Sequence, residues 1–294
     1  MRSPRASGKG RRSAIGAAMA ATALVVALVP ATPAGADETT VDCSNGDNLQ
    51  TAINDADPGD TLVVSGICVR LPDFNFSIGK DLTLVGPATL ESDGGGPVLT
   101  VRPSDVSVTI DSLTITNGDQ TTSLGFGGGI HNRGTVNLHG NSSITGNTAL
   151  FGGGIFNEGG TVNLHDKSSI TDNTADGGSG IVNAGGTVSL YDKSSITDNT
   201  NDSDGVGFFD GDGGGILNAG GTVNLYDKSS ITDNTADGDG GGIFNRSTVN
   251  LHDKSSVTGN TADRDGGGIY NLSTVNLHDK SSVTGNDPDD IFQS

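Results

Sequence analysis

The stretch TVNLHDKSSITDNTA, residues 161–175, decides the fold because the chain repeats it. Close copies begin at Thr135, Thr187, Thr222, Thr248 and Thr274. The isoleucine that ends each GGGI-like step recurs every 25–27 residues, with one interval of 35. Self-similarity of this length is typical of a solenoid, in which each unit buries its apolar face against its neighbours.

Within one unit the apolar residues fall in three short groups. One unit has Ile155, then Val162 and Leu164, then Ile170. Val162 and Leu164 are two residues apart and share one face of a strand, while Gly, Asn and Asp between the groups break any helix. Three short strands and three turns account for one coil of about 25 residues. We therefore predict an all-β fold, a single-stranded right-handed parallel β-helix of about ten coils.

The N-terminal third lacks the motif but keeps its rhythm of short β-rich runs, such as residues 62–66 and 106–110. Residues 47–56 (DNLQTAINDA) place Leu49 and Ile53 on one helical face, which predicts a short capping helix over the first coil. We assign residues 37–118 to this cap and the first coils, and 119–294 to the repeat coils. The final DPDDIFQS offers no matching cap.

Residues 1–36 have the layout of a secretory signal peptide. Basic residues come first, Ala14–Val29 carries no charge, and Ala34-Gly35-Ala36 offers a cleavage site. The pair Arg11-Arg12 leaves a twin-arginine signal as the alternative. The apolar run is too short for a membrane span and no second one follows. We expect a secreted, extracellular or cell-surface protein with no membrane span in the mature chain.

Charge excludes one class of partner. Five of the 16 basic residues lie in the leader, so the mature chain has 11 basic against 35 acidic residues, a net charge of −24. Such a field repels phosphate backbones, and we expect no nucleic-acid binding. The candidate partners that remain are a polysaccharide and a surface protein.

Two stretches resemble known families. Residues 49–66 (LQTAINDADPGDTLVVSG) resemble the start of exported right-handed β-helix proteins of the pectin-lyase-like superfamily. The GGGI step followed by I-x-x-N, as in Ile170–Asn173, is similar to the polymorphic outer-membrane-protein repeat, whose marks are GGA[ILV] and FxxN. The resemblance covers roughly residues 47–286. Ile or Val replaces the Phe, and no pattern of a translocator barrel follows, which counts against an autotransporter.

A β-helix stacks equivalent residues of successive coils about 4.8 Å apart, so each repeated residue becomes a column. Two columns of Asn suit left-handed turns and amide ladders, and we interpret both as structural. The position after each TVNL-like strand points outward and carries a ring, which makes it a candidate ligand face for a sugar polymer or peptide. The alternative is a plain solvated surface. The face comprises His139, His165, Tyr191, Tyr226, His252 and His278, flanked by a lysine column, together with Phe208 and Phe209 in the longest interval.

Cys43 and Cys68 are the only cysteines. In an exported chain, and one coil apart, they predict a disulfide that stabilises the cap by roughly 3 kcal/mol.

Acidic residues gather at the corner before each GGGI step. Stacked carboxylates repel by roughly 1 kcal/mol per neighbouring pair in water, and calcium binds six to eight oxygens, so a calcium site is one hypothesis and solvated turns are the other. No other cofactor is expected. The candidate ligands are Asp210, Asp212, Asp237, Asp239, Asp263 and Asp265.

The resemblance to the pectin-lyase-like superfamily raises the question of catalysis. The polygalacturonase-like marks NTD and RIK are missing, Asp289-Asp290 lies in the tail, and near-identical coils offer few unique residues for an active site. We therefore favour a non-catalytic scaffold with an adhesive or matrix role. The alternative is a polysaccharide lyase, a glycoside hydrolase or a polysaccharide-binding protein.

Overall fold

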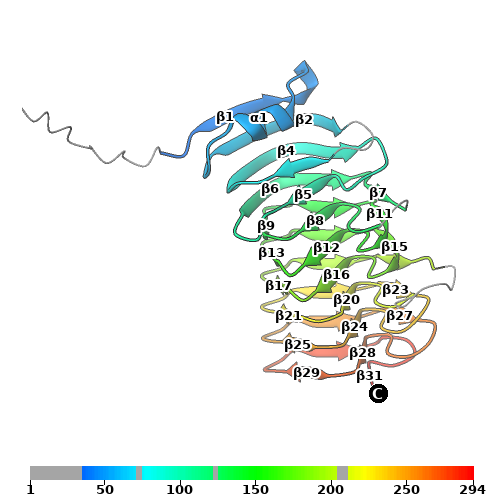
Figure 1. The fold of residues 1–294 in the computed structure, drawn as a ribbon. Helices are drawn as coiled ribbons and strands as arrows, with labels where there is room; N and C mark the ends of the chain where they lie inside the picture. The colour runs from blue at the N-terminus through cyan, green and yellow to red at the C-terminus, as the bar shows by residue number, and fades with distance from the viewer. Residues whose placement is uncertain (1–34, 71–74, 122–124, 204–210) are drawn as a thin grey trace, which may run out of the picture. The chain divides into compact units, whose positions relative to one another are not determined.

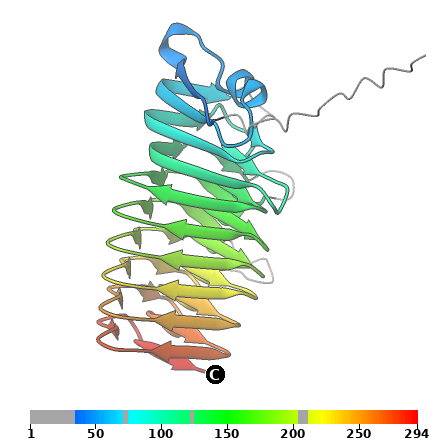
Figure 2. The same cartoon turned by 90° about the vertical axis from the view of Figure 1, so that its left-hand side faces the viewer.

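The protein is seen in a computed structural model that describes residues 35–70, 75–121, 125–203 and 211–294. Ala36–Ser294 form one compact unit, a parallel β-solenoid of about nine turns with about 26 residues per turn (Figures 1 and 2). The predicted fold class is confirmed, with about nine turns where about ten were expected. Nearly all of the predicted signal peptide, with Phe208, Phe209 and Asp210, lies outside the described residues.

Each coil passes through three parallel sheets. Sheet A begins with long strands and then divides into two arms, because from residue 139 onward a turn interrupts the strand in every coil. Its undivided strands are β1 (Glu38–Asp42), β2 (Thr61–Arg70), β4 (Leu82–Ser92) and β6 (Ser107–Thr116).

The first arm comprises β9 (Thr135–His139), β13 (Thr161–Leu164), β17 (Thr187–Leu190), β21 (Thr222–Leu225), β25 (Thr248–Leu251) and β29 (Thr274–Leu277). The second arm comprises β10 (Ser143–Thr145), β14 (Ser169–Thr171), β18 (Ser195–Thr197), β22 (Ser230–Thr232), β26 (Ser256–Thr258) and β30 (Ser282–Thr284).

Sheet B comprises β3 (Phe76–Ile78), β5 (Leu99–Val101), β8 (Ile130–Asn132), β12 (Ile155–Glu158), β16 (Ile181–Ala184), β20 (Ile216–Asn218), β24 (Ile243–Asn245), β28 (Ile269–Asn271) and β31 (Ile291–Gln293). Sheet C comprises β7 (Asp119–Gln120), β11 (Thr148–Phe151), β15 (Thr174–Gly177), β19 (Thr200–Asn201), β23 (Thr235–Ala236) and β27 (Thr261–Ala262).

The register places each residue over its own copy in the next coil. Val162 pairs with Val136 on one side and with Val188 on the other, and Leu164 is flanked by leucines in the same way. Because alternate residues of a strand face opposite sides, this register keeps the repeated Val, Leu and Ile in one continuous core. Val162 and Leu164 are fully buried in it.

The N-terminal end is covered by α1 (Leu49–Asp55), as predicted. Leu49 and Ile53 are buried against the first coil, and the Gln50 side chain both donates to and accepts from the backbone of Ser77 in β3. The predicted disulfide between Cys43 and Cys68 is present and joins the segment η1 (Cys43–Asn45) to β2. Helix and disulfide together close the exposed edge of the solenoid.

The tail beyond residue 286 adds a final strand to sheet B. β31 pairs with β28, and the Gln293 side chain accepts from Asn271 at 2.6 Å. The first arm of sheet A has no such cover, since Leu277 is 47 % exposed where its equivalents in earlier coils are fully buried. No helix in the described parts of the chain is long and apolar enough to cross a membrane.

Candidate functional site

Two columns of Asn hold successive coils together. In the first, the Asn157 amide donates to Asn183 Oδ1 at 2.9 Å; in the second, Asn173 donates to Asn199 Oδ1 at 2.9 Å. Their members are buried, and the same amides also donate to backbone carbonyls. The interpretation of both columns as structural ladders is confirmed, which leaves the outward faces as the candidates for function.

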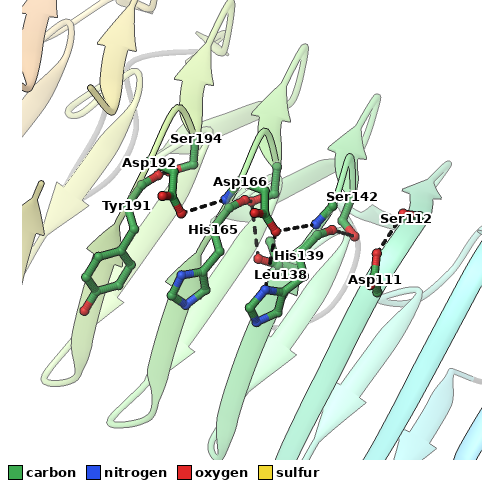
Figure 3. A network of polar contacts seen from close by, with 12 residues as sticks. Asp111, Ser112, Leu138, His139, Ser142, His165, Asp166, Tyr191, Asp192 and Ser194 are labelled. Atoms are coloured by element: carbon green, nitrogen blue, oxygen red, sulfur yellow. Dashed lines mark hydrogen bonds and ion pairs between the residues drawn. The ribbon is translucent and has the colours of Figure 1, made fainter. Parts of the chain in front are cut away.

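The six predicted rings form one continuous stack along the outer face of sheet A. Figure 3 shows His139, His165 and Tyr191 side by side, one from each coil. Consecutive ring centroids lie 4.5, 4.7, 5.1, 4.9 and 4.6 Å apart, and consecutive planes differ by 11° or less. All rings except that of His278, which is exposed, are half-buried.

This stack changes what the ring column can bind. Because each inner ring turns its faces toward the rings above and below, those faces are not open to a sugar. The ring edges remain accessible in part, although His139 Nδ1 lies 3.5 Å from Asp166 Oδ2. The column remains a candidate ligand face, but one that acts through hydrogen bonds at its edges.

An aspartate follows each ring and fixes the turn. Asp166, Asp192 and Asp227 adopt left-handed φ values of 58–59°, which Asp tolerates better than most residues. The Oδ2 atom of Asp192 accepts the backbone N–H of Asp166 at 3.0 Å, and Asp227 does the same for Asp192 at 3.1 Å. The equivalent bond from Gly140 N–H lowers the pKa of Asp166. These carboxylates are therefore held in place by the coil before them.

A buried serine closes the same turn from inside. Ser168 Oγ donates to the carbonyl of His165 at 2.6 Å, and Ser194 donates to Tyr191 at 2.7 Å. Both serines are fully buried. Sequence reasoning missed this role, although the recurring pair Ser-Ser after each lysine was a signal, because one serine of the pair must point inward.

Beside the ring stack a trough runs along six turns. Its volume is about 940 Å³, and five of its six turns each contribute one aspartate and the lysine that follows it. Lys193 and Lys228 are held by backbone bonds to Asp166 and Asp192 of the preceding coil. Among the described residues, none of the trough lysines makes an ion pair within 4.0 Å. The lining comprises Gly140, Asn141, Asp166, Lys167, Asp192, Lys193, Asp227, Lys228, Asp253, Lys254, Asp279 and Lys280.

One histidine of the stack, His165, is disfavoured as a cation. Burial lowers the pKa of His165, and the neighbouring His139 lowers it further. A protonated His165 would stand next to a second imidazole whose centroid is 4.5 Å away. His165 is therefore favoured in its neutral form.

One cluster of charged residues occurs only once. Arg133 binds Glu158 through two hydrogen bonds of 2.8 and 3.1 Å, and His131 Nε2 lies 2.9 Å from the same carboxylate. The hydrogen bond from Arg133 is the main reason that the pKa of Glu158 is lowered. Arg102 lies beside them along a cavity of about 580 Å³. Sequence reasoning missed this cluster because its members come from three different coils.

The acidic corner is organised by backbone bonds. Asp212 Oδ1 accepts the N–H of Asp239 at 3.0 Å, and Asp239 Oδ1 accepts that of Asp265 at 3.1 Å. Asp237 accepts from Ser203 at 3.2 Å. Within the described ranges no group of three or more His, Cys, Asp or Glu side chains is placed to hold a metal. The calcium site, which also includes Asp263, stays a prediction.

Comparison with known protein families finds one that matches part of the chain. The model of the Chlamydia polymorphic membrane protein repeat matches the chain twice, over residues 228–246 and 254–272. Each match runs from a trough lysine through β22–β24 or β26–β28. Ile231, where the repeat pattern has Phe, is fully buried in the core. No curated protein and no solved structure matches. The chain is thus a β-solenoid that contains repeats of the Chlamydia polymorphic membrane protein type.

Proposed function

We propose that this protein is a cell-surface or extracellular β-solenoid scaffold with an adhesive role. The observation that carries the proposal is the uniform outer face, where rings, aspartates and lysines recur in register coil after coil. A regular surface of this kind suits many weak contacts with an extended partner, since linked contacts raise the overall affinity. The polymorphic membrane protein repeats support a location at the cell surface.

A catalytic role is the second candidate, and the Glu158 cluster is the observation that bears on it. An active site requires a local departure from the repeat, which this cluster provides. A glycosidase acid needs a raised pKa to hold its proton, whereas Arg133 lowers the pKa of Glu158. The cluster is therefore better suited to joining coils than to donating a proton, and the non-catalytic role is preferred.

Localisation tests the first half of the proposal. The full chain with a C-terminal epitope tag is produced in a bacterial host, intact cells are treated with protease, and the medium and cell fractions are probed. We expect the tag in the medium or in a protease-sensitive form on intact cells. A tag that is found only in the cytoplasm contradicts a surface scaffold.

Adhesion tests the second half. Beads that carry residues 37–294 are washed over bacterial cells and over immobilised glycans, next to beads that carry an inert protein. We expect the solenoid beads to be retained more strongly on at least one of these surfaces. Retention equal to that of the control beads on every surface contradicts an adhesive role.

A further inference from the structure

The trough beside the ring stack has an unusual charge pattern for this protein. Five of the seven lysines of the chain line it, although the chain as a whole is strongly acidic. Five aspartates line it too, so the two signs balance along its length. A polyanion would meet the aspartates and the negative field of the whole protein, while a polycation would meet the lysines. The charge balance therefore favours a neutral ligand.

The aspartates present a fixed acceptor in each coil. The Oδ2 atoms of Asp192, Asp227 and Asp253 are taken by backbone N–H groups of the coil before. For Oδ1 of the same three residues, no hydrogen bond is found within the described residues. Each carboxylate thus keeps one oxygen available in a position set by its partner, which lowers the entropic cost of binding.

The lysines supply the matching donors. Each ammonium group carries three N–H donors and no acceptor, and the long stem adds apolar surface to the trough wall. The backbone bonds of Lys193, Lys228 and Lys254 to the preceding coil fix the spacing of their stems. Each coil therefore offers one oriented acceptor and one donor group, with a ring edge close by.

We propose that this trough binds a neutral linear polysaccharide that lies along the solenoid axis with one sugar residue per coil. A sugar hydroxyl donates and accepts at once, so it satisfies an aspartate oxygen and a lysine ammonium in the same coil. Because equivalent groups recur about every 4.8 Å along the axis, an extended sugar chain can meet the same pair of groups in several coils. The trough volume of about 940 Å³ falls at the upper end of the range of about 300–1,000 Å³ for ligand sites. This inference rests on the proposed adhesive function and names the ligand of that surface.

The test is a binding titration of residues 37–294 with β-linked glucan and N-acetylglucosamine oligomers of increasing length, and with polygalacturonate as the anionic probe. We expect binding to at least one neutral series, with affinity that rises with oligomer length and changes little with sodium chloride, because no ion pairs form. Failure of both neutral series to bind overturns the inference. So does a preference for polygalacturonate that salt abolishes.

A triple variant locates the site. Lys193→Ala, Lys228→Ala and Lys254→Ala together should weaken binding by about tenfold or more, because three charge-assisted hydrogen bonds are lost. Asn163→Ala, Asn224→Ala and Asn250→Ala make the control, since these half-buried residues lie on β13, β21 and β25 of the same sheet but do not line the trough. Equal loss in both triple variants, or none in the first, overturns the trough as the site.

Two further measurements keep the result interpretable. If the alanine variant fails to fold by circular dichroism, Lys193→Met, Lys228→Met and Lys254→Met keep the stems and remove only the charges. The bead assay separates the two proposals. Beads that adhere without any glycan binding in solution refute the neutral polysaccharide and leave the adhesive scaffold standing, whereas glycan binding without bead retention refutes only adhesion.

Discussion

Replacing Asn173 by Ala tests whether the buried amide ladders hold the coils together. The Asn173 side chain makes five hydrogen-bond contacts, three of which share its two N–H protons. It donates to the carbonyls of Ile144 and Thr171 and to Asn199, each at 2.9 Å, and it accepts from the backbone and the side chain of Asn147 at 3.1 and 2.9 Å. The amide has two N–H donors and two acceptor lone pairs, so these contacts amount to at most four full bonds. At about 1 kcal/mol for each, the free energy of unfolding should fall by about 4 kcal/mol. That loss is a large fraction of the total stability of most domains, about 5–15 kcal/mol.

The matched control is Asn163→Ala in the same coil. The Asn163 side chain donates one bond, to Asn137 at 2.8 Å, and is half-buried, so water can replace the partner. Asn163→Ala should lower the free energy of unfolding by about 1 kcal/mol or less. The assay is urea unfolding followed by circular dichroism, with the midpoint and the slope compared among wild type and both variants. Equal midpoints for the two variants at an unchanged slope would refute the ladder argument.

Three other predictions address the core, the corner and the ring stack. Val223→Asp should unfold the array, because a buried carboxylate without a partner costs several kcal/mol. Tyr226→Ser should lower the melting temperature only slightly. Similar melting curves for the two variants would contradict the assignment of Val223 to the core and Tyr226 to the outer face. The pKa of His165 is lowered in the folded state, so the unfolded chain binds more protons below about pH 6.5 and stability should fall as the solution is acidified through that range. In melts at several pH values, His165→Tyr should reduce this loss of stability at low pH. An unchanged pH profile in the variant would contradict the role given to His165. Millimolar calcium should raise the melting temperature more than sodium chloride of equal ionic strength does. This difference between the salts should vanish when Asn replaces Asp237, Asp239, Asp263 and Asp265. Equal shifts with the two salts would exclude a calcium site at the acidic corner.

The sequence by itself determined the architecture and its columns. A repeat of about 26 residues can bury its apolar groups only against its own copies, so parallel in-register stacking follows from the period. The same register turns every repeated residue into a column, which is why both Asn ladders and the outward ring column could be predicted. The capping helix and the disulfide followed from local signals, namely an apolar face at helical spacing and two cysteines one coil apart.

Only the tertiary structure decided what each column does. The rings stack face to face because neighbouring coils set their side-chain angles, and no sequence pattern encodes those angles. The Asp192 carboxylate binds the backbone of the coil before it, and Ser168 turns inward to close its turn, both as consequences of local left-handed geometry. The Glu158 cluster joins residues about 25 positions apart that do not repeat, and contacts that occur once leave no periodic signal in the sequence.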